Sequence, residues 1–150
     1  MSDSELKLRV QADMKTAMKA REKEKLATIR LILAAIKQKE VDERIEVSDQ
    51  QVTEILDKMF KQRKESIEQF SKANRQDLVD KEAFEVDVIR SYLPEPLSEQ
   101  EIAALIEQKI AEVDASSMKD MGKVMGLLKP IMQGRADMSQ VSALIKKKLT

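Results

Sequence analysis

The sequence contains no cysteine and no histidine, and glycine, proline and aromatic residues are scarce. Without cysteine there can be no disulfide, and the two absences together exclude thiolate and imidazole metal sites. They also exclude Ser-His and Cys-His catalytic arrangements. Walker loops and Gly-x-Gly-x-x-Gly turns are missing too. We therefore expect no catalytic residue, no metal site and no cofactor; a pair of carboxylates in a cleft is the catalytic option left open.

Long hydrophobic runs are also missing. The longest run, Leu31–Ile36, is far shorter than the ~20 residues that a membrane-spanning helix needs. The N-terminus is charged from Asp3 onward and has no apolar signal-peptide core. Because the lack of cysteine fits a reducing compartment, we expect a soluble, cytoplasmic protein.

Helix-forming residues dominate the 150-residue chain, of which 42% is hydrophobic and 36% charged. This composition predicts an all-α protein with a modest core. No glycine or proline occurs before Pro94, so residues 1–92 are predicted to be an N-terminal four-helix bundle with helices over about 4–21, 24–42, 48–70 and 77–92. The predicted inward-facing residues are Leu6, Val10, Met14, Ala17, Met18, Leu26, Ile29, Leu33, Ile36, Val52, Ile55, Leu56, Met59, Phe60, Ile67, Phe70, Leu78, Val79, Val86 and Ile89.

Two prolines separated by one residue, Pro94 and Pro96, force extended backbone and predict a linker at residues 93–97. Residues 98–150 are then predicted to form a small C-terminal domain of three helices. Capping residues mark where these helices begin: Ser98 with Glu101, then Ser116 or Ser117 for a helix over about 118–132, then Asp137.

All three glycines and five of the nine methionines lie between Met118 and Met138. At helical spacing the methionines form one apolar stripe, which predicts either core or a seam for a partner helix. Its members are Met118, Met121, Met125, Leu128 and Met132, with Val124 and Ile131 beside them.

Gly122, Gly126 and Pro130 are spaced by four residues on the opposite side of the same helix, together with Lys119 and Lys123. Glycine in a helix interior costs ~1 kcal/mol relative to alanine, so the two glycines indicate that backbone comes close to something. A phosphate backbone would use the lysine charges and the missing side chains. Close packing of a neighbouring helix explains the pattern equally well.

The charge distribution indicates either a surface that faces a polyanion or self-pairing between copies of the chain. Residues 115–150 carry seven basic against two acidic residues, after a strongly acidic stretch at residues 95–114. Arg135, Lys146 and Lys147 could extend the basic surface, whereas Gly134 suits the left-handed position after a helix. All four aromatic residues, which we expect in the N-terminal core, precede the linker. Their absence from the basic segment favours a folded RNA recognised through its backbone.

Motifs along nearly the whole chain are similar to those of the GatB/YqeY family, and the chain resembles its small YqeY-like members. The matching motifs are Ala17-Met18-Lys19, Leu26-x-x-Ile29-Arg30, Lys61-x-Arg63-x-Glu65-Ser66, Asp77-Leu78 with Glu82 and Glu85, Tyr92-Leu93-Pro94, Asp120-Met121-Gly122-Lys123-Val124-Met125-Gly126 and Gly134-Arg135-Ala136-Asp137.

The resemblance implies a helical bundle followed by a tail domain like the one that ends the B subunit of glutamine-dependent tRNA amidotransferase. It implies that Lys119, Gly122, Lys123, Gly126 and the Gly134–Arg135 pair contact tRNA. It also implies that components of the amidotransferase or of aminoacyl-tRNA synthetases are candidate partners. The ATP-dependent catalytic parts of the amidotransferase have no counterpart in 150 residues, so the carbon–nitrogen ligase activity of that complex is not expected of this chain.

Three functions therefore remain open. The chain is a tRNA-binding accessory module, or a protein-interaction adaptor that docks through its methionine-rich helix without binding RNA, or a catalytic amidotransferase subunit. The missing histidine, cysteine and nucleotide-binding motifs weigh against the third.

Overall fold

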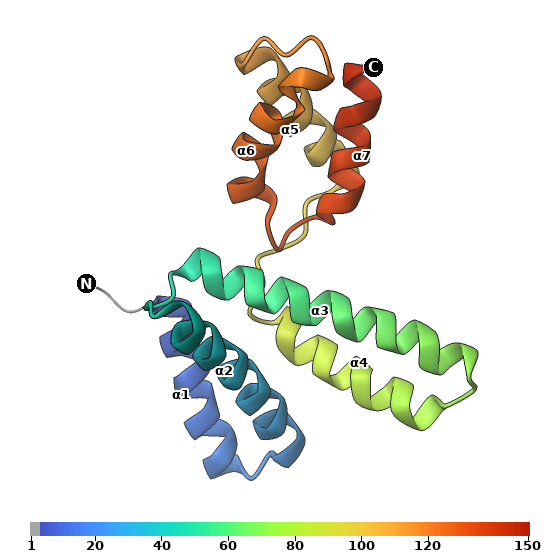
Figure 1. Cartoon of the computed structure of the whole chain (residues 1–150). Helices are drawn as coiled ribbons and strands as arrows, with labels where there is room; N and C mark the ends of the chain where they lie inside the picture. Colours follow the sequence, from blue (N-terminus) through green and yellow to red (C-terminus); the bar gives the residue numbers. More distant parts are fainter. Residues whose placement is uncertain (1–3) are drawn as a thin grey trace. The chain divides into compact units, whose positions relative to one another are not determined.

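The computed structural model describes residues 4–150 and contains only helices in that range (Figure 1). The prediction of an all-α protein is confirmed. The helices are α1 (Glu5–Ala20), α2 (Lys23–Glu43), α3 (Asp49–Lys72), α4 (Gln76–Arg90), α5 (Glu99–Glu112), a short 3-10 helix η1 (Met118–Asp120), α6 (Met121–Met132) and α7 (Met138–Leu149). The chain divides into two compact units, Met1–Leu93 and Pro94–Thr150. No helix of residues 4–150 is both long and apolar enough to cross a membrane.

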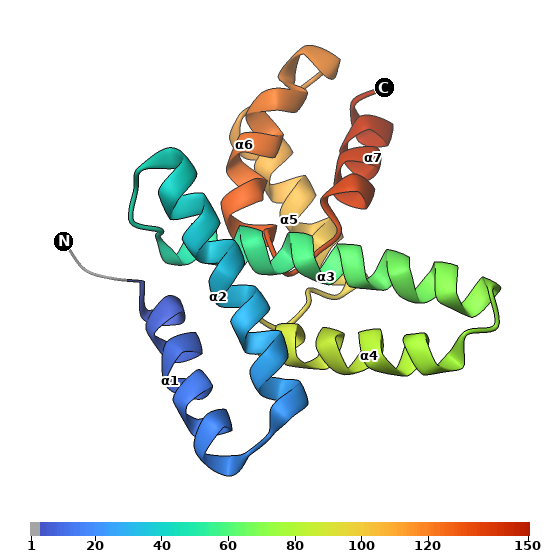
Figure 2. The ribbon, with the colours of Figure 1, turned by 60° about the horizontal axis from the view of Figure 1, so that its bottom comes forward.

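The first unit consists of two helical hairpins, α1 with α2 and α3 with α4, which run in different directions (Figures 1 and 2). They share one core where they meet, at the first half of α3 and the end of α4. The buried side chains are Val10, Ala17, Ile29, Ile32, Ile36, Val47, Val52, Leu56, Met59, Val88, Ile89, Tyr92 and Leu93.

The distal part of the α3–α4 hairpin extends beyond this core. No residue from Lys61 to Asp87 is buried, and an ion pair between Arg63 Nε and Glu85 Oε2 at 3.0 Å joins the two helices there. The expectation that the N-terminal aromatics are core is therefore wrong for Phe84, which is 38% exposed. Met18 is also exposed, because each helix has too few neighbours to bury its whole apolar side.

Tyr92, from the Tyr-Leu-Pro motif, fastens the end of α4 to α1. Its ring is buried, and its hydroxyl donates a hydrogen bond of 2.6 Å to Asp13 Oδ2. The Arg9 guanidinium lies 4.9 Å from the ring centroid and donates to the Ser91 carbonyl at 3.0 Å. Burial, helped by the Asp13 carboxylate, raises the pKa of the Tyr92 hydroxyl above its ordinary 10.0, so the hydroxyl keeps its proton and donates this hydrogen bond even in mildly alkaline solution. The motif therefore has a structural explanation.

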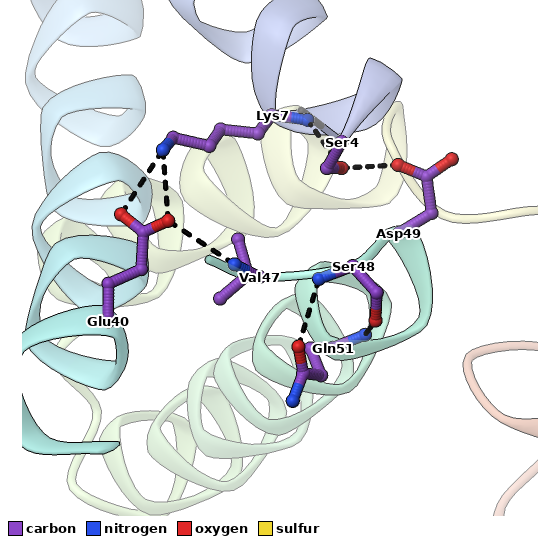
Figure 3. A network of polar contacts seen from close by, with 7 residues as sticks. All are labelled: Ser4, Lys7, Glu40, Val47, Ser48, Asp49 and Gln51. Atoms are coloured by element: carbon purple, nitrogen blue, oxygen red, sulfur yellow. Dashed lines mark hydrogen bonds and ion pairs between the residues drawn. The ribbon is translucent and has the colours of Figure 1, made fainter. Parts of the chain in front are cut away.

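A network of polar contacts holds the first turn of α1 against the start of α3 and the end of α2 (Figure 3). The Ser4 hydroxyl caps α1 by accepting the Lys7 N–H at 3.1 Å and donates to Asp49. Lys7 Nζ pairs with Glu40 Oε2 at 3.0 Å, and the same carboxylate accepts the Val47 N–H at 3.3 Å. The predicted capping box of Ser48 and Gln51 is confirmed beside it.

These contacts predict a pH-dependent stability. Hydrogen bonding from Lys7 lowers the pKa of Glu40 below its ordinary 4.5, and hydrogen bonding from Ser4 lowers that of Asp49 below 3.8. Because both pKa values are lower in the folded state, the stabilisation is complete above pH 4.5 and is lost as the pH falls through the folded values. We expect Glu40→Gln with Asp49→Asn to flatten the fall in unfolding free energy between about pH 6 and pH 3, measured by urea denaturation. An unchanged slope would exclude this network as its source.

The second unit packs α5 and α7 against α6. Its buried side chains are Ile106, Val124, Leu128, Met132, Val141, Ile145 and Leu149. The predicted capping box of Ser98 and Glu101 and the predicted Asp137 cap are both confirmed. The predicted helix over 118–132 is wrong in its first turn, because Met118–Asp120 form the 3-10 helix η1. Met118, predicted to belong to the core or to a seam for a partner helix, is 40% exposed.

Candidate nucleic-acid interface on α6

Helix α6 has one buried side and one exposed side. Val124, Leu128 and Met132 are buried, and Met121 and Met125 pack against them, so the methionine stripe lies against the core of its own unit, except for Met118. The opposite side carries Gly122, Lys123, Gly126, Lys129 and Pro130, all exposed. We call these five residues, together with Lys119 of η1, the α6 face.

Neither helical glycine is required by packing. A Cβ added to Gly122 or to Gly126 would meet no atom within 4 Å. No other helix of the second unit therefore approaches these backbone positions, which contradicts the close-packing interpretation within this unit.

Nor are these glycines required by backbone conformation. The chain places non-glycine residues at four left-handed turn positions, where glycine would be the unstrained choice: Arg21, Arg44, Asn74 and Asp114, with φ of 58°, 54°, 58° and 52°. Gly122 and Gly126 instead occupy a regular helix, where glycine is unfavourable. The two positions thus carry a cost that no contact or turn among the described residues explains.

The lysines of the α6 face have no ion pair among the described residues and one carboxylate nearby. Lys119, Lys123 and Lys129 are exposed, and none has an ion pair among the described residues, whose pairs in this unit are Lys109–Glu112 and Lys148–Glu107. Asp120 lies near Lys119 and Lys123. It accepts the Ser116 N–H at 3.0 Å, which lowers its pKa, and the two lysines lower it further. The face therefore has a net positive charge at neutral pH.

Gly134 and Arg135, also predicted as site residues, have structural roles. Gly134 is buried and has φ of 80°, following Gln133 with φ −57° and ψ 124°. With the Arg135 N–H donating to the Met132 carbonyl at 2.8 Å, this is a type II turn, whose third residue needs a positive φ. The prediction of a left-handed glycine is confirmed, but its burial removes Gly134 from any contact surface.

Arg135 fastens the segment before α5. Its Nε donates to the Glu95 carbonyl at 2.8 Å, and its own carbonyl accepts the Leu97 N–H at 2.8 Å. Leu97 in turn packs against the core of the unit. The backbone and one guanidinium nitrogen of Arg135 are therefore engaged in hydrogen bonds within the unit.

We expect Gly134→Ala to lower the unfolding free energy of this unit by about 1–2 kcal/mol, because alanine is strained at positive φ. Gln133→Ala, at the preceding position of the turn where φ is negative, is the control. Thermal denaturation followed by circular dichroism measures both. Equal unfolding free energies of Gly134→Ala and Gln133→Ala would show that alanine is not strained at position 134.

Lys146 and Lys147, predicted to extend the basic surface, are exposed on α7. Lys147 lines a groove of about 610 Å³ together with residues of α5 such as Ile102. The neighbouring Lys148 pairs with Glu107 of α5 at 2.8 Å. These contacts place Lys147 and Lys148 on the side of α7 that borders α5.

Lys129 was not among the predicted site residues, although it lies on the α6 face. It follows Gly126 by three residues and Gly122 by seven, spacings that put all three on one side of a helix. The same periodicity that grouped the glycines was the signal that could have identified it.

The comparison with protein-family models is unambiguous. The model of the family described as Yqey-like protein matches residues 7–149, and so spans both units.

Similar proteins occur in fungi. "Altered inheritance of mitochondria protein 41, mitochondrial" of Lachancea thermotolerans is 36% identical over 140 residues, covering 89% of this chain and 75% of the relative. The protein of the same name in Pyrenophora tritici-repentis is 34% identical over 141 residues, covering 92% and 77%.

The names of these relatives contradict the prediction of a cytoplasmic protein, which is wrong by this comparison. The prediction rested on missing cysteine and on the composition of the N-terminus. Neither feature distinguishes the cytoplasm from another compartment that lacks structural disulfides.

The match over residues 7–149 and the identity to both fungal proteins lead to the same assignment. The chain belongs to the Yqey-like protein family.

Proposed function

We propose that this protein is a non-catalytic accessory module that binds folded tRNA through the sugar–phosphate backbone, using the α6 face. Lys119, Lys123 and Lys129 would neutralise phosphates, and Gly122 and Gly126 would let the backbone approach the helix. The α6 face has no aromatic side chain, so bases would not be read by stacking.

One observation carries the proposal. Two glycines stand in a regular helix with open space around them, between lysines that have no ion pair in the described structure. A binding partner with a bulky, anionic surface accounts for both features together.

We further propose that the chain functions as a four-helix N-terminal bundle and a three-helix tail domain, joined at residues 93–97. The two separate hydrophobic cores support this division. The tail would contact tRNA, and the bundle would be free to contact components of a tRNA amidotransferase or an aminoacyl-tRNA synthetase.

The direct test is binding of a fluorescently labelled tRNA transcript at several salt concentrations. We expect Lys119→Glu with Lys123→Glu to weaken binding at least about tenfold and to reduce the slope of log affinity against log salt by about two, because two phosphate contacts are lost. Lys58→Glu with Lys64→Glu, which makes the same charge change on exposed positions of α3, is the matched control.

Two results would contradict the proposal. One is equal tRNA affinity of the Lys119/Lys123 variant and the parent when both are folded. The other is an equal loss in the Lys58/Lys64 control, which would indicate an effect of total charge rather than of the α6 face.

The alternative adaptor function loses its original argument. It required an exposed methionine stripe, whereas the buried and partly buried side chains of that stripe form the core of the second unit.

A further inference from the structure

Helix α2 has a second apolar face in addition to the one that it buries. Ile29, Ile32 and Ile36 are buried in the core. On the other side lie five exposed residues, Ala27, Leu31, Ala34, Gln38 and Val41, which we call the α2 seam. Leu31 is 46% exposed and Val41 is 60% exposed. Large apolar side chains on the solvent side of a helix indicate an interaction surface when they are aligned.

The α2 seam is aligned with the register of a helix–helix contact. Its members are spaced by four, three, four and three residues, the alternation that defines the apolar positions of a coiled coil. At ~100° per residue they fall within about 80° of the helix circumference and span about 21 Å along the axis. A second helix lying along α2 would contact all five.

One edge of the α2 seam is uniformly basic. Arg30 and Lys37 lie seven residues apart on α2, so they form a row beside the apolar residues. Arg44 follows seven residues later but is the left-handed residue that ends α2, outside the helical register. Neither Arg30 nor Lys37 has an ion pair among the described residues, where Glu40 pairs with Lys7 and Glu43 with Lys39. Lys37 is near enough to Glu40 to help lower the pKa of that carboxyl. The row is therefore available to a partner.

We propose that the α2 seam docks an amphipathic helix of another protein, one whose apolar residues follow the same register and whose edge facing the row carries Glu or Asp. The apolar contacts provide the burial, and the ion pairs of Arg30 and Lys37 fix the register and the choice of partner.

A second copy of the chain fits less well. If two α2 helices paired in parallel, the basic row of one copy would face Ala35 and Asp42 of the other, leaving Arg30 without a partner. If they paired antiparallel, the two basic rows would face each other. RNA also fits less well, because a phosphate backbone cannot bury the apolar side chains of Leu31 and Val41. Gln38 is the one polar residue of the α2 seam between them.

The test uses the full chain and two synthetic helical peptides of three heptads, with leucine at the seam positions. One peptide has Glu along both edges and the other has Lys. We expect the acidic peptide to bind at least about tenfold tighter, measured by fluorescence anisotropy. Arg30→Glu with Lys37→Glu should invert this preference, whereas Lys58→Glu with Lys64→Glu should not. Leu31→Asp with Val41→Asp should abolish binding of the acidic peptide.

A second readout identifies the natural partner. A photo-crosslinking amino acid placed at Gln38 in cells should capture an acidic amphipathic segment of another protein. Crosslinks to a second copy of the chain, or to RNA, would overturn the proposal. Equal binding of the two peptides, or a preference that survives Arg30→Glu with Lys37→Glu, would overturn it as well.

Discussion

Replacing Leu128 by alanine is expected to unfold the second unit while the first stays folded. Leu128 is fully buried in α6, in a core of seven buried residues. Truncating such a leucine costs about 3–5 kcal/mol, because the lost burial and the cavity both count. A unit that spans Pro94–Thr150 has about that much stability in total, so little folded population should remain.

Leu127→Ala provides a matched control, because Leu127 is the preceding residue of α6 and is 36% exposed. We expect it to cost less than about 1 kcal/mol. Circular dichroism should show part of the helical signal missing in Leu128→Ala, and limited trypsin digestion should remove the C-terminal residues and leave a stable fragment that ends at Lys109, the first trypsin site after the first unit. Loss of the whole helical signal would show that the two units do not fold independently.

The helices were predictable because their signals are local. The capping boxes at Ser48 and Ser98 depend on residues three positions apart, and the structure has both. Apolar periodicity likewise identified most buried residues, including Ile29, Leu56 and Ile89. A helix that pairs its first N–H groups with its own side chains needs no information from the rest of the chain.

Exposure was less predictable because it depends on which neighbours a helix finds. Met18 fits the apolar pattern of its helix, and Phe84 was expected in the core as an aromatic residue. Both are nevertheless exposed, since the two hairpins overlap only near one end. The α2 seam is the converse case. The side of α2 with Leu26, Ile29, Leu33 and Ile36 was predicted to face inward and does, but Leu31 and Val41 on its other side also stay exposed.

The site illustrates a different limit. From the sequence, the glycines of α6 fit a close helix contact as well as a ligand, because both need a missing side chain. Only the coordinates of neighbouring atoms distinguish them, and the space around Gly122 and Gly126 is open. Gly134 looked equivalent in the sequence and is a buried turn residue.

The pair of substitutions Gly122→Ala and Gly126→Ala is expected to change stability and RNA binding in opposite directions. Alanine is better than glycine in a helix by up to ~1 kcal/mol per position, and each added Cβ would meet no atom within 4 Å. The unfolding free energy should therefore rise by about 1–2 kcal/mol. If the helix backbone lies against phosphates, the same methyl groups should weaken tRNA binding about tenfold, which is ~1.4 kcal/mol.

The two measurements are denaturant unfolding and tRNA anisotropy on the same preparations. Gly126→Leu extends the series, because leucine is also a good helix former but projects further, so affinity should fall again without loss of stability. Higher stability with unchanged affinity would remove the glycines from the binding face and leave the lysines alone. Lower stability would mean that other atoms of the protein occupy the space around the glycines in solution. That result would support the close-packing interpretation. Higher stability together with weaker binding would be explained by a partner that approaches the α6 backbone from outside. Within the second unit, no contact depends on the missing side chains of Gly122 and Gly126.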